Sequence, residues 1–570
     1  MDFVRTSVDP HGICTTGANT TVYNPRLVTD DDRQYLAYYG TDGPGDPSSL
    51  RVAVRDLPSG TWSVRSIGPA IGLHDGHYAP ALGIGPAGHL FVCFNTRNSP
   101  IQWCRSTDPG SIAAFDDVET GMTGENEASA CYPEFTRLAD GTLLFGYRNG
   151  GSGSGNWHLN RWDPEMEAWD VVSHPITFGG EARNAYHWNL VESSDGVLHY
   201  AFCWRETPDV TTNSRLCYAR SPDRGVTWER STGEPYELPI TIDSAEIIDP
   251  VDQDQGLINQ GWAATNPRTD RLHVAYLRDD DAGHTQLYHA WEDPETGWQR
   301  EAVTARTDTT RIAGGGVRPM PLGRPAIVVD DDGTVFIVTR DGTQGGYPLV
   351  FRRDAAWTVA ILYRRNLVGS EIHLDRDRWR RDGVFSYIDQ ATSVNYTGDT
   401  TAWLAGGTTP IGVTDVEFGE EAGSTDGTQP GAPDRVRFHS AGHVGPDPVA
   451  CRDWTVVCGL PYTELEFPAT PVQFRMTARL TGGPGRLRPV VVDTEGDRHD
   501  AGRVLEWTAP NTGMVASDWM TLPAIPAGEL LLEGHSTDDP PMEVNRASLA
   551  LSYEDPEPSL PTLVASEDHR

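Results

Sequence analysis

The stretch PEFTRLADGTLLFGYR, residues 133–148, consists of an apolar entry, an aspartate-glycine turn and a strand of apolar and aromatic residues. Its apolar positions alternate after the turn, which is typical of a strand in a sheet. Similar segments recur along the chain as PRLVTDDDRQYLAYYG (25–40), PALGIGPAGHLFVCFN (80–95), NLVESSDGVLHYAFCW (189–204), AATNPRTDRLHVAYLR (263–278) and PAIVVDDDGTVFIVTR (325–340).

A second hairpin follows each copy, for example HLNRWDPEMEAWDV (158–171) and LYHAWEDPETGWQRE (287–301). The turn glycines Gly88, Gly141 and Gly196 are 53 and 55 residues apart. Four-stranded units at such a period indicate a β-propeller. With a seventh, divergent copy in SEIHLDRDRWRRDGVFSYIDQ (370–390), the sequence predicts an all-β fold with a seven-bladed propeller, and six blades is the competing count.

The repeat ends near residue 390, so we assign residues 1–390 to the propeller and expect it to be the catalytic domain. GEEAGSTDGTQPGAPDR (419–435) has the composition of a linker or an exposed loop. The short, irregularly spaced strands that follow predict a β-sandwich accessory module over 391–555. Residues 556–570 are expected to be a disordered tail.

The chain of 570 residues has a net charge of -36 and contains no lysine. This acidity argues against nucleic acid and anionic membranes as partners. Acidic runs such as VDDDGT fit a solvated surface, and they also fit a protein adapted to high salt (halophilic). No run of 18 apolar residues suggests a membrane span. The first residues lack a signal peptide, so we expect a cytoplasmic protein or a secreted one whose leader was removed.

Eight cysteines in a chain of this length do not make a disulfide framework. Buried free thiols are the default expectation, and disulfides between paired strands or a structural zinc site stay open. No CxxC motif occurs. We expect no cofactor to be required for catalysis, while a structural calcium or zinc ion in a blade remains an alternative.

In three consecutive blades, polar residues recur at equivalent positions, just before and just after the inner strand. They form the pairs His77 with Arg97, Tyr132 with Arg148, and Tyr186 with Arg205. Loops at the ends of the inner strands build propeller sites, so we expect these side chains to meet in one pocket. Guanidinium groups match a carboxylate or a sulfate, and a His and a Tyr beside them can transfer protons.

This inventory fits β-elimination next to a uronic acid, in which a cation stabilises the charge that develops on the carboxylate. Glycoside hydrolysis usually needs a carboxylate pair instead. No acid occupies the corresponding positions of these blades. Glu134 lies near Tyr132, but strand alternation directs it elsewhere unless the backbone bulges.

YPEFTRLADGTLLFGYRNGGSGSGNWHLNRWD (132–163), WRETPDVTTNSRLCYARSPDRGVTW (204–228) and GRPAIVVDDDGTVFIVTRD (323–341) resemble the BNR-repeat propeller polysaccharide lyases. That family includes ulvan lyases and related enzymes that act on rhamnosyl-glucuronate linkages. The resemblance implies an anionic polysaccharide or oligosaccharide as substrate. It also implies that an arginine neutralises the uronate while histidine and tyrosine divide the base and acid roles.

Carried over to this chain, the family motifs assign catalytic roles to His77, Tyr132 and Arg148, and place Tyr186 and Arg205 against the substrate. One position departs from the family. Many relatives read His-Asn after the first inner strand, where this chain has Arg97 and Asn98. Arginine keeps its proton at ordinary pH, so we assign both residues to substrate binding, with Arg97 as a second anion clamp.

Two other functions stay open at this stage. One is a glycoside hydrolase on the same scaffold, such as a rhamnosidase; a sialidase is disfavoured by the lack of an early RIP motif. The other is a carbohydrate-binding propeller without catalysis.

Overall fold

The computed structural model contains mainly β-structure. It describes residues 2–391 with gaps at 15–18, 22–23, 44–45, 59, 71–74, 181–182, 308–311, 316–319, 321, 342–345, 354–355, 363–366 and 368, and beyond them residues 407–418 and separate strands between 437 and 553. One α-helix, α1 (Arg376–Asp382), stands among forty strands in this part of the chain. The predicted all-β class is confirmed.

Five antiparallel sheets follow one another along the chain, and each contains one of the recurring phrases. Four of them have four strands each. The first contains β6 (Ala81–Ile84), β7 (Leu90–Cys93), β8 (Gln102–Arg105) and β9 (Glu119–Thr120), and the second contains β10 (Ala130–Arg137), β11 (Leu143–Asn149), β12 (Asn156–Asp163) and β13 (Ala168–Thr177). Later in the chain, one sheet contains β19 (Ala263–Asn266), β20 (Arg271–Asp279), β21 (Thr285–Asp293) and β22 (Gly297–Ala302), and another contains β23 (Ala326–Val329), β24 (Val335–Arg340), β25 (Pro348–Arg353) and β26 (Trp357–Ile361). The fifth has β14 (Asn184–His187) and β15 (Val191–Glu192) beside β16 (Leu198–Arg205), then β17 (Asn213–Ser221) and β18 (Glu246–Asp249).

A larger sheet joins the two ends of this series. It holds β2 (Leu27–Asp30), β3 (Arg33–Gly40), β4 (Ser49–Asp56) and β5 (Ser63–Pro69), and also β27 (Leu374–Asp375), β28 (Val384–Asp389) and β29 (Thr408–Glu417) next to β1 (Asp2–Ile13). β1 pairs along its length with β29, and at Gly12 with β3. Because these groups share one hydrogen-bonded sheet, the blade count of seven stays a prediction.

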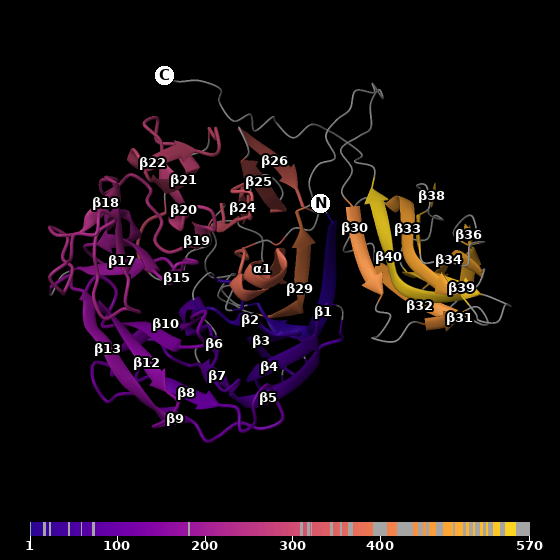
Figure 1. Cartoon of the computed structure of the whole chain (residues 1–570), viewed down its shortest axis with the longest axis horizontal. Helices are drawn as coiled ribbons and strands as arrows, with labels where there is room; N and C mark the ends of the chain where they lie inside the picture. Colours follow the sequence, from indigo (N-terminus) through magenta and orange to yellow (C-terminus); the bar gives the residue numbers. More distant parts are fainter. Residues whose placement is uncertain are drawn as a thin grey trace.

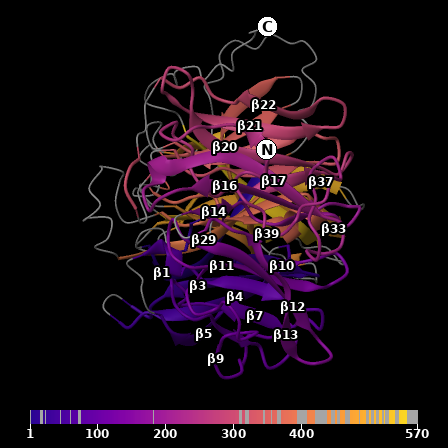
Figure 2. The ribbon, with the colours of Figure 1, turned by 90° about the vertical axis from the view of Figure 1, so that its left-hand side faces the viewer.

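The sheets form a ring around α1 (Figure 1). Seen after a quarter turn, β5, β9 and β13 lie at one end of the ring, and β20, β21 and β22 lie at the other (Figure 2). The propeller-type arrangement predicted from the repeat is therefore present. Since β29 lies beyond residue 390 and pairs with β28 and β1, strand pairing of the ring includes residues after that predicted boundary.

The C-terminal strands form two groups that are antiparallel within themselves. One contains β30 (Arg437–Gly442), β31 (Val449–Cys451), β33 (Pro471–Gly482), β37 (Gly513–Ala516), β38 (Met520–Thr521) and β40 (Met542–Tyr553); the other contains β32 (Thr455–Tyr462), β34 (Gly485–Asp493), β35 (Arg498–Asp500), β36 (Leu505–Trp507) and β39 (Gly528–His535). The first group is joined to the large sheet by a parallel bridge between Val4 of β1 and His439 of β30. The sandwich module over 391–555 stays a prediction. The predicted tail, 556–570, lies outside the described residues.

The inner strands are buried on both faces, as in β16, where all eight residues are buried. The thiols of the six described cysteines, Cys14, Cys93, Cys104, Cys131, Cys203 and Cys217, are buried and form no disulfide. Within the described residues, no helix is long and apolar enough to cross a membrane.

The turn SPDRGVTW (221–228) is held by its own polar groups. Asp223 accepts hydrogen bonds from the backbone N–H and the hydroxyl of Thr227, at 2.8 and 2.7 Å. Gly225 has a φ of +94°, and its N–H donates to Ser221 Oγ at 2.7 Å. A Cβ at Gly225 would overlap the buried side chain of Leu159 in the neighbouring sheet. The turn therefore fixes the packing of two sheets, as expected for a structural motif.

Gly225→Ala should lower the free energy of unfolding more than Gly196→Ala does. Both glycines have positive φ, but no atom lies within 4 Å of the Cβ position at Gly196. The control should therefore lose only the backbone term, about 1–2 kcal/mol. Gly225→Ala should lose about 1–3 kcal/mol more through overpacking against Leu159. Urea unfolding of the two variants and the parent protein measures the difference, and equal losses would contradict this account of the turn.

Candidate active site

The predicted site residues come from the same end of three adjacent inner-strand pairs. Because paired strands run antiparallel, the start of one strand meets the end of the next. Cys131, beside Tyr132, pairs with Arg148, and Asn184 of β14 pairs with Arg205 of β16. His77 lies in the short 3-10 helix η2 (Gly76–Tyr78) directly before β6. The residues at equivalent positions of the repeat thus lie at one end of the ring.

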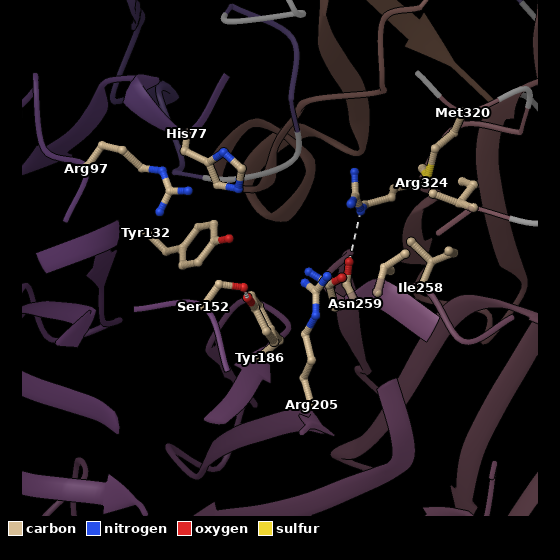
Figure 3. Close-up of a pocket in the computed structure, with 12 residues that line it drawn as sticks. His77, Arg97, Tyr132, Ser152, Tyr186, Arg205, Ile258, Asn259, Met320 and Arg324 are labelled. Atoms are coloured by element: carbon tan, nitrogen blue, oxygen red, sulfur yellow. Dashed lines mark hydrogen bonds between the residues drawn. The ribbon is translucent and has the colours of Figure 1, made fainter. Parts of the chain in front are cut away.

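A pocket of about 490 Å3, part of it open to solvent, lies at this end (Figure 3). Of the seven predicted site residues, the structure places five in its wall: His77, Arg97, Tyr132, Tyr186 and Arg205. The other two contact wall residues without lining the pocket: Arg148 is buried behind the wall against Tyr186, and Asn98 is exposed beside Arg97. None of the twelve lining residues is an aspartate or a glutamate.

Asp75 positions His77. It caps the N-terminus of η2, where Oδ1 accepts the backbone N–H of His77, and the same carboxylate contacts Nδ1 of the imidazole. Burial lowers the pKa of His77 to about 4; the Asp75 carboxylate opposes this effect and the Arg97 charge reinforces it. The neutral ring with a proton on Nδ1 has its lone pair on Nε2, and the ring faces the pocket (Figure 3).

Tyr132 stands in a β-bulge. Its φ is +58°, a left-handed conformation that is rare for an aromatic residue, and the register of β10 with β11 shifts between Cys131 and Glu134. Such local strain tends to persist at functional positions. The bulge presents the Tyr132 ring to the pocket, 5.4 Å from the His77 ring between centroids.

Glu134 is not brought into the pocket by this bulge. Its carboxylate is buried at 3.3 Å from Nε2 of His187 and accepts the Leu190 N–H at 3.0 Å, and Arg376 lies 3.6 Å away. Strand alternation therefore correctly predicted that the Glu134 side chain points away from the pocket, although the backbone bulges here. An acidic catalytic partner for Tyr132 is missing from the described wall.

Two buried guanidinium groups lie against the tyrosines. Arg148 lies 4.8 Å from the Tyr132 ring centre, and Arg205 lies 5.0 Å from that of Tyr186. Arg148 donates to Gly150 O and to Asn98 Oδ1, at 3.0 and 3.1 Å. Arg205 donates to the backbone oxygens of Pro208 and Asp209. In the described part of the chain, neither forms an ion pair with a carboxylate.

Arg97, the departure from the family pattern, reaches the pocket wall. It donates to Asp75 Oδ2 at 3.2 Å and to Asn98 Oδ1 at 3.0 Å. The amide oxygen of Asn98 therefore accepts from Arg97 and Arg148 together. These contacts give both Arg97 and Asn98 a place in the network, while their contact with substrate stays a prediction.

Sequence reasoning missed several lining residues. Ser152, Asn259 and Arg324 contribute polar groups, and Arg324 is paired with Glu371 at 2.6 Å. Four aliphatic side chains, those of Val210, Ile258, Ile312 and Met320, also line the pocket, and Ile258 and Met320 lie across it from the tyrosines (Figure 3). Arg324 directly precedes the strand segment PAIVV, at the repeat position that Tyr132 occupies in its own blade, so the repeat could have revealed it. No group of three or more His, Cys, Asp or Glu residues suited to a metal ion occurs among the described residues.

Comparison with known proteins gives similarities in sequence and in fold. Residues 33–306 match the model of a BNR repeat-containing family. The long isoform of an ulvan lyase from Alteromonas sp is 32% identical over 163 residues, which are 25% of this chain and 16% of that protein. The corresponding protein of Pseudoalteromonas sp. (strain PLSV) is 30% identical over 166 residues, 26% of this chain and 17% of that protein. The matched stretch is thus about one sixth of the length of these relatives.

Solved structures extend the likeness in fold. The polysaccharide lyase Uly1 aligns with a TM-score of 0.53 at 15% identity, covering 74% of this chain and 99% of that one. A PL25 ulvan lyase bound to -[GlcA(1-4)Rha3S]- aligns with a TM-score of 0.50 at 12% identity, covering 62% and 85%. At these identities the likeness concerns the fold alone. Residues 33–306 therefore resemble the BNR-repeat family in sequence, and the chain has the propeller-type fold of solved ulvan lyases.

Proposed function

We propose that this protein is a polysaccharide lyase that cleaves a glycosidic bond next to a uronic acid by β-elimination. One observation carries the proposal: a pocket lined by arginine, histidine and tyrosine, in which the described residues supply no acid to the wall and no carboxylate partner to the two buried guanidiniums of Arg148 and Arg205. A buried charge is costly without a counter-charge. An anionic group of the substrate would supply it.

The reaction requires two proton transfers and one neutralised carboxylate. The guanidiniums bind the uronate carboxylate and stabilise the charge that develops there. Nε2 of His77 accepts the C5 proton, and the electron pair of the C5–H bond forms the C4–C5 double bond. The C4–O bond breaks as this double bond forms, and the hydroxyl of Tyr132 donates a proton to the leaving oxygen. Asp75 stabilises the imidazolium that forms on His77.

Hydrolysis is less well supported by this pocket. It usually employs two carboxyl groups about 5–9.5 Å apart. Two acids beside the proposed catalytic tyrosine and histidine are held by other groups: the buried Glu134 by His187, and the partly exposed Asp75 by His77 and Arg97. Neither lines the pocket.

We propose a glycan of uronic acid and a deoxyhexose such as rhamnose, as in ulvan, for the substrate. The named relatives are ulvan lyases, and one solved neighbour binds -[GlcA(1-4)Rha3S]-. The aliphatic side chains of Val210, Ile258, Ile312 and Met320 offer an apolar surface to the methyl group of such a sugar.

Incubation with ulvan and with other uronate polymers, at low and at high salt, tests the proposal. The expected product is an unsaturated uronate with its ultraviolet absorbance. Release of free rhamnose without that absorbance would favour a glycosidase, and binding without any product would favour a carbohydrate-binding propeller.

Tyr132→Phe should lower kcat by about 10²–10⁴-fold, because the proton donor to the leaving oxygen is lost. KM should change little, since the ring that packs on Arg148 remains. Tyr35→Phe, which loses a hydrogen bond to Gly110 O far from the pocket, is the matched control. Full turnover by the Tyr132 variant would remove this residue from the proton transfer.

The pH profile of kcat/KM should fall on the acid side near pH 4, where His77 takes up a proton and loses its lone pair. An ordinary histidine would place this limb near pH 6.5. The folded-state pKa is lowered, so His77 is neutral and competent above about pH 4. Asp75→Asn should reduce kcat by about 10²-fold or more by freeing the ring orientation. A limb near pH 6.5, or an Asp75 variant with full kcat, would contradict the assigned role of His77.

A further inference from the structure

Tyr186 lies between the two guanidiniums that have no carboxylate partner among the residues that the structure describes. The guanidinium carbon of Arg205 is 5.0 Å from its ring centre and that of Arg148 is 5.7 Å away. Arg148 Nη1 also contacts the phenolic oxygen, at 3.4 Å. Two cations therefore act on one buried phenol, whose exposed fraction is 1%.

The phenolic oxygen of Tyr186 also contacts a neutral hydroxyl. Ser152 Oγ is 2.8 Å away, and Ser152 and Tyr186 both point into the pocket (Figure 3). The side chain of Asn184, whose Oδ1 accepts the Gly153 N–H at 2.7 Å, favours the ionised form of the phenol as well. Donors around an oxygen stabilise its ionised form.

Several other buried guanidiniums of the chain have acidic counter-ions. Arg55 pairs with Asp415 at 2.7 Å and Arg278 pairs with Asp249 at 2.8 Å. Arg148 and Arg205 have backbone carbonyls and neutral side chains instead. Asp209, which interacts with Arg205 at longer range, is held by Thr211 and the Gly314 N–H. The group best placed to carry the missing negative charge is the phenol between them.

We propose that Tyr186 is a phenolate in the resting site, the internal counter-ion of Arg148 and Arg205, and that a substrate carboxylate replaces it and drives its protonation. The phenolate oxygen gains the proton from solvent as the carboxylate takes over the guanidiniums, so binding one carboxylate takes up one proton. This inference rests on the proposed function only for the identity of the anion that binds.

The remaining groups around Tyr186 agree with this charge balance. Burial by itself raises the pKa of Tyr186, but the charges of Arg148 and Arg205 and the polar side chains of Ser152 and Asn184 bring it below the ordinary value for tyrosine. Cys203, its register partner on β16, stays neutral because burial raises its pKa to about 12. Tyr132 is the other phenol in contact, at 5.8 Å between ring centroids.

The ultraviolet spectrum of tyrosinate provides the first test, and it needs no catalysis. The spectrum of the unmodified protein minus that of Tyr186→Phe should contain one tyrosinate band below the pH at which ordinary tyrosines ionise, and adding glucuronate should remove it. Tyr288→Phe is the matched control. Its ring also lies 4.8 Å from a guanidinium, that of Arg278, but this group is paired with Asp249 and the pKa of Tyr288 is raised, chiefly by burial.

Calorimetry of glucuronate binding to the unmodified protein provides the second test. Titrations in buffers of different ionisation enthalpy should give an uptake of about one proton for each glucuronate bound. The affinity for glucuronate should fall about tenfold for each unit rise in pH over the range in which Tyr186 is ionised in the free protein. Tyr186→Phe and Arg205→Gln should abolish the uptake.

Absence of the tyrosinate band, a band that glucuronate leaves unchanged, or binding without proton uptake would overturn the inference. Failure to bind glucuronate would overturn the exchange of counter-ions. A protein that shows the band and the uptake but produces no unsaturated uronate would contradict the lyase function and leave this inference standing.

Discussion

The site depends on two buried positive charges, those of Arg148 and Arg205, that no carboxylate of the described residues neutralises. The chain has 81 acidic and 45 basic residues, so acids were available for pairing. Elsewhere it uses them, as in the buried pair of Arg55 and Asp415. Guanidiniums buried without an acid lose hydration and gain no ion pair in return. Stability alone gives no reason for this arrangement, whereas binding of a carboxylate does.

Local backbone geometry then places proton-transfer groups beside the cations. The bulge at Tyr132 rotates one phenol toward the pocket and leaves Glu134 among His187 and Leu190. The cap of η2 gives His77 a carboxylate partner on one nitrogen and directs the other toward the pocket. A cation, an oriented imidazole and a phenol are the parts that elimination needs, and a second carboxylate in the wall would instead favour hydrolysis.

Much of this arrangement could be predicted from sequence because the repeat carries it. The spacing of the turn glycines predicts the propeller, and the shared phase of Tyr132, Arg148, Tyr186 and Arg205 predicts that they meet. The burial of Arg148 behind the wall could not be predicted, since it follows from the bulge beside it, and strand alternation assumes a regular pleat. Asp75 was missed because its role depends on a single turn of 3-10 helix. The aliphatic part of the wall combines Val210 with Ile312 and Met320, which do not occupy equivalent positions of the repeat.

The central claim is that this pocket breaks its glycosidic bond by elimination and adds no water. The most direct measurement is mass spectrometry of both products from a uronate oligosaccharide of known mass, with the products resolved before any further reaction. Elimination predicts that the two product masses sum to the mass of the substrate. A sum greater by one water molecule would show hydrolysis and would contradict the account.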